Sequence, residues 1–200
     1  MPEKKTAVSF DLDGVLFPRI PIQLEAFKPW SYNKPLRPKH NPIYIADRIP
    51  QNHPLSLLEQ AVMQLHAKRF VKSNIAEKIR QIHADIKIGN TGRSNNLAMV
   101  NLTWERLRQG KVSDEFKYIN FKPDGISSDE SKYWGLVELK NMGYANVIHY
   151  DDSARTVKRL AKVLPDIRFV IVQDLTSGIL FSRLEMQKYP NVARIAKLKF

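Results

Sequence analysis

The sequence predicts a three-layer α/β fold in which a parallel β-sheet is flanked by helices. Two patterns predict it: short apolar segments recur along the chain, and segments with apolar residues at helical spacing lie between them. Strands that alternate with helices are typical of parallel sheets covered on both faces. The 200 residues are enough for one such core, so residues 1–200 are interpreted as a single domain.

The expected strands are short, rich in apolar or β-branched residues and bounded by polar or turn residues. Four of them are residues 7–10, 85–89, 145–150 and 167–172, and a shorter one is residues 116–121.

The helices between these strands are predicted from apolar residues three or four positions apart, which form one stripe on a helix. The stripes are Leu58, Val62 and Leu65 in a helix of about residues 55–70; Ile75, Ile79 and Ile82; Leu97, Val100, Trp104 and Leu107; Tyr133, Leu136 and Val137; and Val157, Leu160, Ala161 and Leu164. The tail, residues 182–200, is expected to be a helix docked on the core.

Residues 17–72 are interpreted as an insertion after the first strand, either a flap or a small cap. Residues 17–54 contain eight prolines, which disfavour long regular elements. Trp30, Tyr32 and Tyr44 lie there among lysines and arginines. Long loops in compact domains are often lids or binding loops.

The formal net charge of +12 creates a field that attracts phosphate-bearing partners, although a basic protein without such partners has the same composition. The chain has no cysteine, which excludes disulfides, thiolate metal sites and a cysteine nucleophile. No apolar run in the sequence is long enough to span a bilayer, and residues 1–5 lack the apolar segment and cleavage site that are typical of a signal peptide. We therefore expect a cytoplasmic protein without a membrane partner.

The most informative motif is the end of the first strand, where Asp11 and Asp13 are followed by Gly14. Alternate residues of a strand share a face, so the two carboxylates are expected on one side. Such a pair, together with substrate phosphate, is a usual way to hold Mg²⁺. A solvated turn at the end of a strand gives the same local pattern.

Polar residues also follow two other expected strands. Thr91 and Gly92 come after the second, where backbone N–H groups and a hydroxyl can bind an anion, although such residues also cap helices without any ligand. Asp151 and Asp152 follow the strand of residues 145–150, and Lys132 opens the helix before it. In parallel sheets, ligands bind beyond the carboxyl ends of the strands.

These motifs resemble, in order, the four motifs of the haloacid dehalogenase (HAD) superfamily of phosphohydrolases: residues 11–15, residues 91–93, Lys132, and Asp151 with Asp152. The resemblance implies a Rossmannoid, HAD-like domain and an Mg²⁺-dependent phosphatase. Residues 121–125 and 131–132 also resemble the phosphatase domain of polynucleotide kinase-phosphatases and related nucleic-acid repair domains. Ser153 stands where those domains usually have an arginine.

By this resemblance, Asp11 is the nucleophile that forms an aspartyl-phosphate, and Asp13 donates and accepts the protons. Thr91, Gly92 and Lys132 bind the substrate phosphate, and Arg93 is a further candidate contact to substrate. Lys122 is an alternative to Lys132. The metal ligands are Asp11, Asp13 through its backbone carbonyl, Asp151 and Asp152, and which of the last two binds directly is left open.

The expected substrate is a phosphate ester, with a nucleotide or a nucleic-acid terminal phosphate favoured by the basic, aromatic flap. The alternative is a nucleic-acid-binding or assembly protein that retains a HAD core without turnover. His53, His66 and His83 are predicted to have no catalytic role. His149 directly precedes Asp151 and Asp152 in the sequence, and its interpretation as a packed or partly exposed residue without a catalytic role is left open.

Overall fold

The computed structural model describes residues 4–18, 36–38, 50–172 and 187–195. Its strands form one six-stranded sheet, in the order β3-β2-β1-β4-β5-β6, and every neighbouring pair is parallel. The strands are β1 (Thr6–Phe10), β2 (Ile86–Ser94), β3 (Tyr118–Lys122), β4 (Asn146–Asp151), β5 (Arg168–Val172) and β6 (Val192–Ile195). The predicted parallel α/β fold is confirmed.

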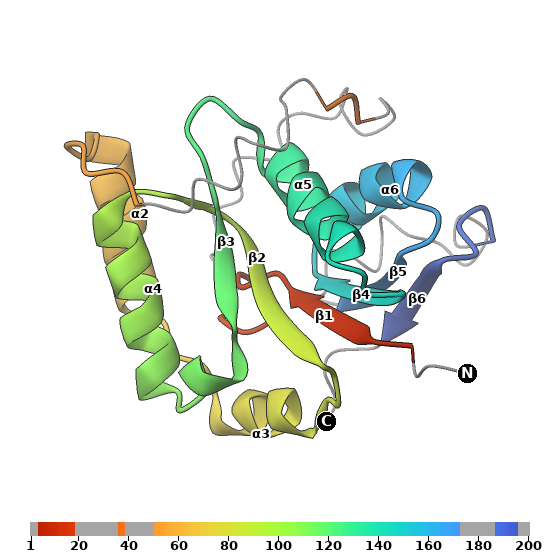
Figure 1. The fold of residues 1–200 in the computed structure, drawn as a ribbon. Helices are drawn as coiled ribbons and strands as arrows, with labels where there is room; N and C mark the ends of the chain where they lie inside the picture. The colour runs from red at the N-terminus through yellow and green to blue at the C-terminus, as the bar shows by residue number, and fades with distance from the viewer. Residues whose placement is uncertain (1–3, 19–35, 39–49, 173–186, 196–200) are drawn as a thin grey trace.

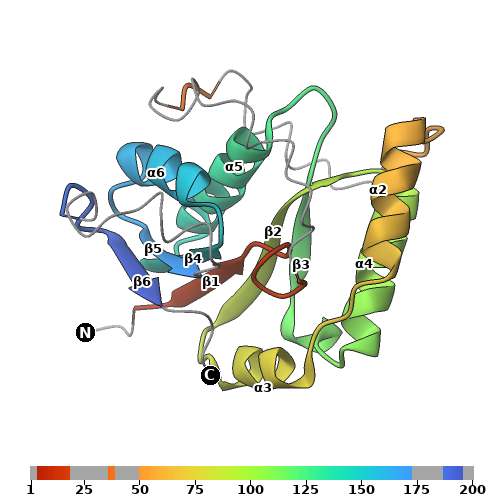
Figure 2. The same cartoon turned by 180° about the vertical axis from the view of Figure 1, so that it is seen from behind.

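The helices cover both faces of the sheet (Figures 1 and 2). They are α2 (Leu57–Ala67), α3 (Ser73–Gln81), α4 (Leu97–Gln109), α5 (Ser128–Asn141) and α6 (Ala154–Val163), with a 3₁₀ turn at Ser113–Glu115. Helices α5 and α6 pack on one face, and α3 and α4 pack on the other, with α2 against α4. The result is the three-layer arrangement that the sequence predicts.

Two hydrophobic clusters separate the layers because successive strand residues point to opposite faces. In β1, Ala7 belongs to the cluster under α5 and α6, whereas Val8 and Phe10 belong to the cluster under α3 and α4. Burial of apolar side chains on both sides explains why the strands read as continuous apolar runs.

Two expected elements are corrected by the structure. The second strand ends at Ser94 instead of Gly89, with an irregularity in its pairing to β3 between Asn90 and Ser94. The tail contributes the edge strand β6 where a helix was expected. Four residues are too few to show a helical or strand period, so only their pairing with β5 identifies this element.

Part of the predicted insertion lies outside the described residues, namely residues 19–35 and 39–49, which include Trp30, Tyr32 and Tyr44. Residues 182–186 and 196–200 of the predicted tail helix also lie outside them. Within the described part of the insertion, the predicted helix is present as α2, which begins with a capping box between Ser56 and Glu59. None of the helices in the described ranges combines the length and the apolar character needed to cross a membrane.

Candidate active site

The site is centred on Asp11, directly after the inner strand β1. Its N–H donates to the carbonyl of Tyr150 at 2.8 Å, so the bond to β4 continues one residue beyond the strand. One carboxylate oxygen accepts the N–H of Leu12 at 2.9 Å, and the residue is only 6% exposed. Asp11 therefore lies buried at the carboxyl end of β1, whose neighbours in the sheet are β2 and β4. The strand order reverses at this point, which is the usual location of ligands in such sheets.

Lys132 of α5 joins the ends of β1 and β4. Its Nζ atom lies 3.0 Å from Oδ2 of Asp11 and donates to Oδ2 of Asp151 at 2.7 Å. All three side chains are buried. By contrast, the Lys122 ammonium donates a hydrogen bond to the carbonyl of Pro123 at 3.4 Å. Of the two candidate lysines, the structure brings Lys132 to the aspartates.

Two buried asparagines fix the position of α5. Asn90 donates to the carbonyl of Lys132 at 3.0 Å, while the amide of Asn120 donates both to Asn90 and to the carbonyl of Ser131. A Cβ atom on Gly135 would lie 2.7 Å from the Asn120 amide nitrogen, so the glycine permits this close approach. These contacts attach the first turns of α5 to β2 and β3.

Asp151 and Asp152 complete an acidic cluster. One ligand atom from each of Asp11, Asp151 and Asp152 lies within 4.8 Å of the others, and all three residues are buried. Gly14 has a φ of +82°, and a Cβ atom there would lie 1.9 Å from an oxygen of Asp152. The loop after β1 can thus approach the cluster only with glycine at this position.

The charges of the cluster are strongly coupled. Burial raises the pKa of Asp11, Lys132 opposes this effect, and Asp151 and Asp152 add to it. Burial also acts to raise the pKa of Asp151, but Lys132 and His149 hold it below its usual range. The pKa of Lys132 is raised above its usual range because the attraction of Asp11 and Asp151 exceeds the effect of burial. The lysine is therefore a permanent cation.

His149 lies between Ser9 and Asp151 and fixes the orientation of the Asp151 carboxylate. It is fully buried, with Nε2 at 3.2 Å from Oδ2 of Asp151 and Nδ1 at 3.0 Å from the hydroxyl of Ser9. The other carboxylate oxygen of Asp151 accepts the N–H of Ser153 at 2.7 Å. Asp151 is thus held by groups on β4, on α5 and at the start of α6, and Ser9 of β1 contacts it only through His149.

Asp13 departs from the expected arrangement, because its carboxylate points to a second group of side chains. Arg69 donates to Oδ1 at 2.6 Å, and Arg93 donates to both carboxylate oxygens at 2.9 and 3.0 Å. The chain leaves the extended conformation after Phe10, so alternation no longer places Asp11 and Asp13 on one side. Although burial acts to raise the pKa of Asp13, the positive charges of Arg93 and Arg69 hold it below its usual range.

Thr91 and Gly92 lie within β2, where a turn was expected. The hydroxyl of Thr91 accepts the N–H of Arg93 at 3.2 Å. A Cβ atom on Gly92 would lie 2.5 Å from the Oγ atom of Ser128, so glycine allows β2 to pass close to the start of α5. Phe10 pairs with Gly89, which places Thr91 and Gly92 just beyond the end of β1 along the neighbouring strand.

The acidic cluster has the donors that suit a hard divalent cation. The three carboxylates of Asp11, Asp151 and Asp152, less the one ammonium of Lys132, have a formal charge of −2, and all the donors are oxygen atoms. Buried carboxylates at this spacing are stabilised by a cation such as Mg²⁺. Asp11, Asp151 and Asp152 are the residues that would hold it.

Several residues of the site were not assigned to it from the sequence, although His66 was considered and expected to have no catalytic role. Arg69 and His66 come from the end of the α2 segment, and nothing in their local pattern distinguishes them from a solvated helix end. Asn90 and Asn120 are different, because a polar amide inside an apolar strand already indicates a buried hydrogen-bond partner. That signal was available for Asn120, inside the expected strand of residues 116–121, whereas Asn90 lay one residue beyond the expected end of the second strand.

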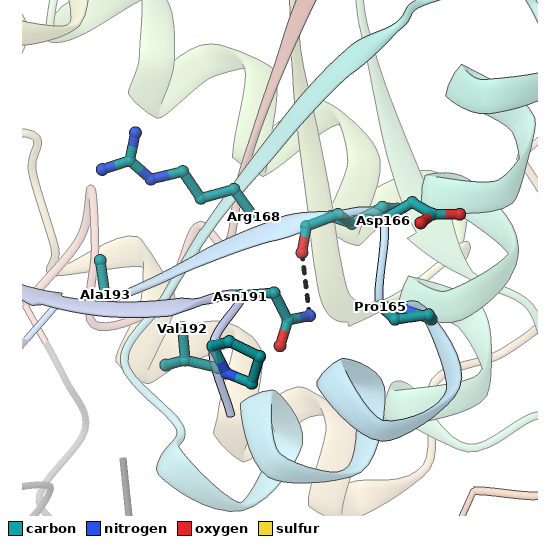
Figure 3. Close-up of a pocket in the computed structure, with 8 residues that line it drawn as sticks. Pro165, Asp166, Arg168, Asn191, Val192 and Ala193 are labelled. Atoms are coloured by element: carbon teal, nitrogen blue, oxygen red, sulfur yellow. Dashed lines mark hydrogen bonds between the residues drawn. The ribbon is translucent and has the colours of Figure 1, made fainter. Parts of the chain in front are cut away.

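The hollow that Figure 3 shows lies at the other end of the strands. It has a volume of about 450 Å³ and lies between two segments. One leads into β5 and includes Pro165 and Arg168, and the other leads into β6 and includes Asn191. It contains none of the residues of the acidic cluster.

No protein-family model and no curated protein matches the sequence. Among solved structures, the fold is similar to that of a haloacid dehalogenase-like family hydrolase from Streptococcus pneumoniae, with a TM-score of 0.52 and 11% sequence identity. The match covers 96% of this chain and 94% of the other chain. The chain therefore has a HAD-like, Rossmannoid fold.

Proposed function

We propose that this protein is an Mg²⁺-dependent phosphohydrolase of the HAD type that acts through an aspartyl-phosphate intermediate. The observation that carries the proposal is the buried set of Asp11, Asp151 and Asp152 with Lys132 between two of them. The similarity of the fold to that of a HAD-like hydrolase supports the proposal that this protein is a hydrolase.

In this proposal, Asp11 attacks the phosphorus atom in line and the P–O bond to the leaving group breaks. Asp13 is proposed to supply the proton that the leaving oxygen takes up, and later to accept a proton from the water that hydrolyses the aspartyl-phosphate. Because its carboxylate is held ionised by Arg69 and Arg93 in this structure, it must leave these partners and take up a proton before it can act as the acid. A separate carboxylate is needed because Asp11 cannot be the nucleophile and the proton carrier at once.

Thr91, Gly92 and Lys132 are proposed to bind the other phosphoryl oxygens. The buried ammonium of Lys132, which already contacts Asp11, is placed to stabilise negative charge at the reacting group. Mg²⁺, held by Asp11, Asp151, Asp152 and the backbone carbonyl of Asp13, would reduce the repulsion between the carboxylate nucleophile and the phosphate.

The proposed substrate class is a nucleotide or a nucleic-acid terminal phosphate. It is supported by the net charge of +12, which favours encounter with polyanions. The aromatic residues that suggested base stacking, Trp30, Tyr32 and Tyr44, lie outside the described residues.

The test is phosphate release from nucleotides, sugar phosphates and 3′- or 5′-phosphorylated oligonucleotides, with and without Mg²⁺. Turnover is expected only with the metal. It is expected to be lost in Asp11→Asn and kept in Asp114→Asn, which alters an exposed aspartate remote from the acidic cluster. An inactive wild-type protein, or an active Asp11→Asn variant, would contradict the proposal. Salt-sensitive oligonucleotide binding without turnover would instead support a binding protein with a HAD core.

A further inference from the structure

Arg69 is a buried arginine with unused hydrogen-bond donors beside the proposed phosphatase site. The residue is 9% exposed, and Nη1 donates to Oδ1 of Asp13 at 2.6 Å and to Nδ1 of His66 at 2.9 Å. Its Nε and Nη2 atoms are buried and have no hydrogen-bond partner among the residues that the structure describes. A buried guanidinium with free donors is costly unless an acceptor fills the place.

In the neighbouring Arg93, each of the three guanidinium nitrogens already donates a hydrogen bond. It donates to both oxygens of Asp13, it donates through Nη1 to Thr103 at 2.9 Å, and its guanidinium lies 4.4 Å from the centre of the Phe17 ring. The two arginines and one aspartate have a formal charge of +1. The excess positive charge and the unused donors are therefore both found at Arg69.

His66 adds no charge to this group. An arginine can only donate hydrogen bonds, so Nδ1 of His66 accepts a hydrogen bond from Nη1 of Arg69, carries no proton itself, and the ring is neutral. Burial, with Arg93 nearby, lowers the pKa of His66 to about 4, which agrees with this neutral form. The Asp13 side chain is 31% exposed, so solvent reaches the group from the side of Asp13.

The position of Arg69 relates this group to the acidic cluster. Asp13 lies two residues from Asp11, and Asp152 is close enough to affect the pKa of Arg69. An anion bound to Arg69 would thus lie beside the reacting phosphate without being the same group. A guanidinium fork suits phosphate oxygens, which accept two parallel hydrogen bonds.

We propose that Arg69 forms a second anion-binding subsite and that the preferred substrate is a phosphomonoester whose leaving group bears another phosphate group. This inference rests on the proposed function for the reacting phosphate, but it concerns a different group of the substrate. The additional phosphate can be a terminal monoester, as in a nucleoside bisphosphate, or an internucleotide diester, as in a phosphorylated oligonucleotide.

Three thymidine compounds test the subsite and distinguish the two sources. Thymidine 3′-monophosphate has only the reacting phosphate, thymidine 3′,5′-bisphosphate adds a monoester, and a 3′-phosphorylated dithymidine adds a diester. For the wild-type protein with Mg²⁺, kcat/KM is expected to be about tenfold or more higher for at least one of the latter two. Equal values for all three would overturn the proposal.

Variants locate this preference at Arg69. The ratio of the preferred compound to the monophosphate is expected to fall about tenfold or more in Arg69→Gln, whereas Lys68→Gln, which removes the same charge at an exposed neighbouring position, keeps it. Because Arg69 also contacts Asp13, the ratio is the readout: a general loss of activity affects all three compounds alike. Arg69→Lys retains a charge and tests the site if the glutamine variant does not fold, with an intermediate ratio expected. An unchanged ratio in both variants, or an equal loss in Lys68→Gln, would refute the subsite.

Direct binding separates this inference from the proposed function. Calorimetric titration of Asp11→Asn with the same compounds measures affinity without turnover. A preference that Arg69→Gln removes in this background would support the subsite even if no phosphatase activity were found. The absence of any preference would overturn it even if the wild-type protein were an active phosphatase.

Discussion

Gly14 combines a left-handed backbone with a very close neighbour. Its φ is +82°, and the Cβ atom of any other residue would overlap the carboxylate of Asp152. Gly143 has a similar φ of +87°, but nothing lies within 4 Å of a Cβ atom there. The two glycines therefore separate the cost of the backbone conformation from the cost of disturbing the site.

Gly14→Ala is expected to weaken Mg²⁺ binding at least tenfold, because Asp152 must move away from the new methyl group. Gly143→Ala is expected to cost about 1–2 kcal/mol of unfolding free energy, the usual cost of the left-handed conformation, and to leave Mg²⁺ affinity unchanged. Calorimetric metal titration and urea unfolding of both variants measure these effects. Equal Mg²⁺ affinity in the two variants would contradict the role assigned to Gly14.

His149 connects Ser9 to Asp151 inside the protein. His149→Phe keeps a ring of similar size but leaves a hydroxyl and a carboxylate oxygen without this partner. We expect a loss of about 1–3 kcal/mol in the free energy of unfolding, measured with urea. Ser9→Ala removes the same hydrogen bond from the other side, so the double variant is expected to lose less than the sum of the two single variants. Strict additivity would show that the two groups are not coupled.

The sequence predicted which acidic side chains lie close together where their positions follow from a local pattern. Asp11, Asp151 and Asp152 stand at strand ends, and the parallel sheet brings those ends together. The partner of Asp13 could not be found in this way. Arg69 is 56 residues away, and its position depends on how the α2 segment packs against the loop after β1.

At the scale of elements, the centres of the strands were predicted better than their ends. The apolar run of β2 is visible in the sequence, but its last residues, Thr91 to Ser94, are polar and pair irregularly with β3. Similarly, β6 was not predicted because its extended conformation depends on pairing with β5, and its own four residues show no strand pattern. Tertiary contacts decide such segments.

Asn191 is the residue that attaches β6 to the core. Its amide donates to the carbonyls of Ile167, Leu164 and Ala161 at 3.0, 3.2 and 3.4 Å, and Figure 3 shows it beside the start of β5. It also precedes Val192, whose side chain is buried. Its contacts thus connect the edge strand to the end of α6 and to the loop that follows.

Asn191→Ala is expected to destabilise the protein by about 1–3 kcal/mol and to increase amide hydrogen exchange mainly in Val192–Ile195, because an edge strand has one paired side. Hydrogen exchange followed by mass spectrometry measures the local effect. Asn101→Ala, at an exposed position of α4, is the matched control and is expected to leave exchange in β6 unchanged. Uniform exchange changes throughout the sheet would contradict a local role.

At the scale of the whole molecule, the buried titratable groups of the site make the free energy of unfolding depend on pH. Burial lowers the pKa of His66 to about 4, from an ordinary value of 6.5. Between these values the unfolded chain binds a proton at this position and the folded protein does not, so unfolding becomes easier as the pH falls. His149 acts in the same direction because burial lowers its pKa, whereas the raised pKa of Asp11 acts in the opposite direction. Asp13 and Asp151 have lowered pKa values, and their contribution is lost only at more acidic pH.

The contribution of His66 can be isolated by difference. In His66→Gln, the side chain can still accept a hydrogen bond from Arg69 but does not ionise. The unfolding free energy of the wild-type protein is therefore expected to fall more steeply than that of the variant as the pH is lowered from 6.5 to 4, by up to about 1.4 kcal/mol per pH unit. His83→Gln, at an exposed position, is expected to follow the wild-type curve. Urea unfolding at several pH values measures the three curves, and parallel curves for the wild type and His66→Gln would show that His66 is not held neutral in the folded protein.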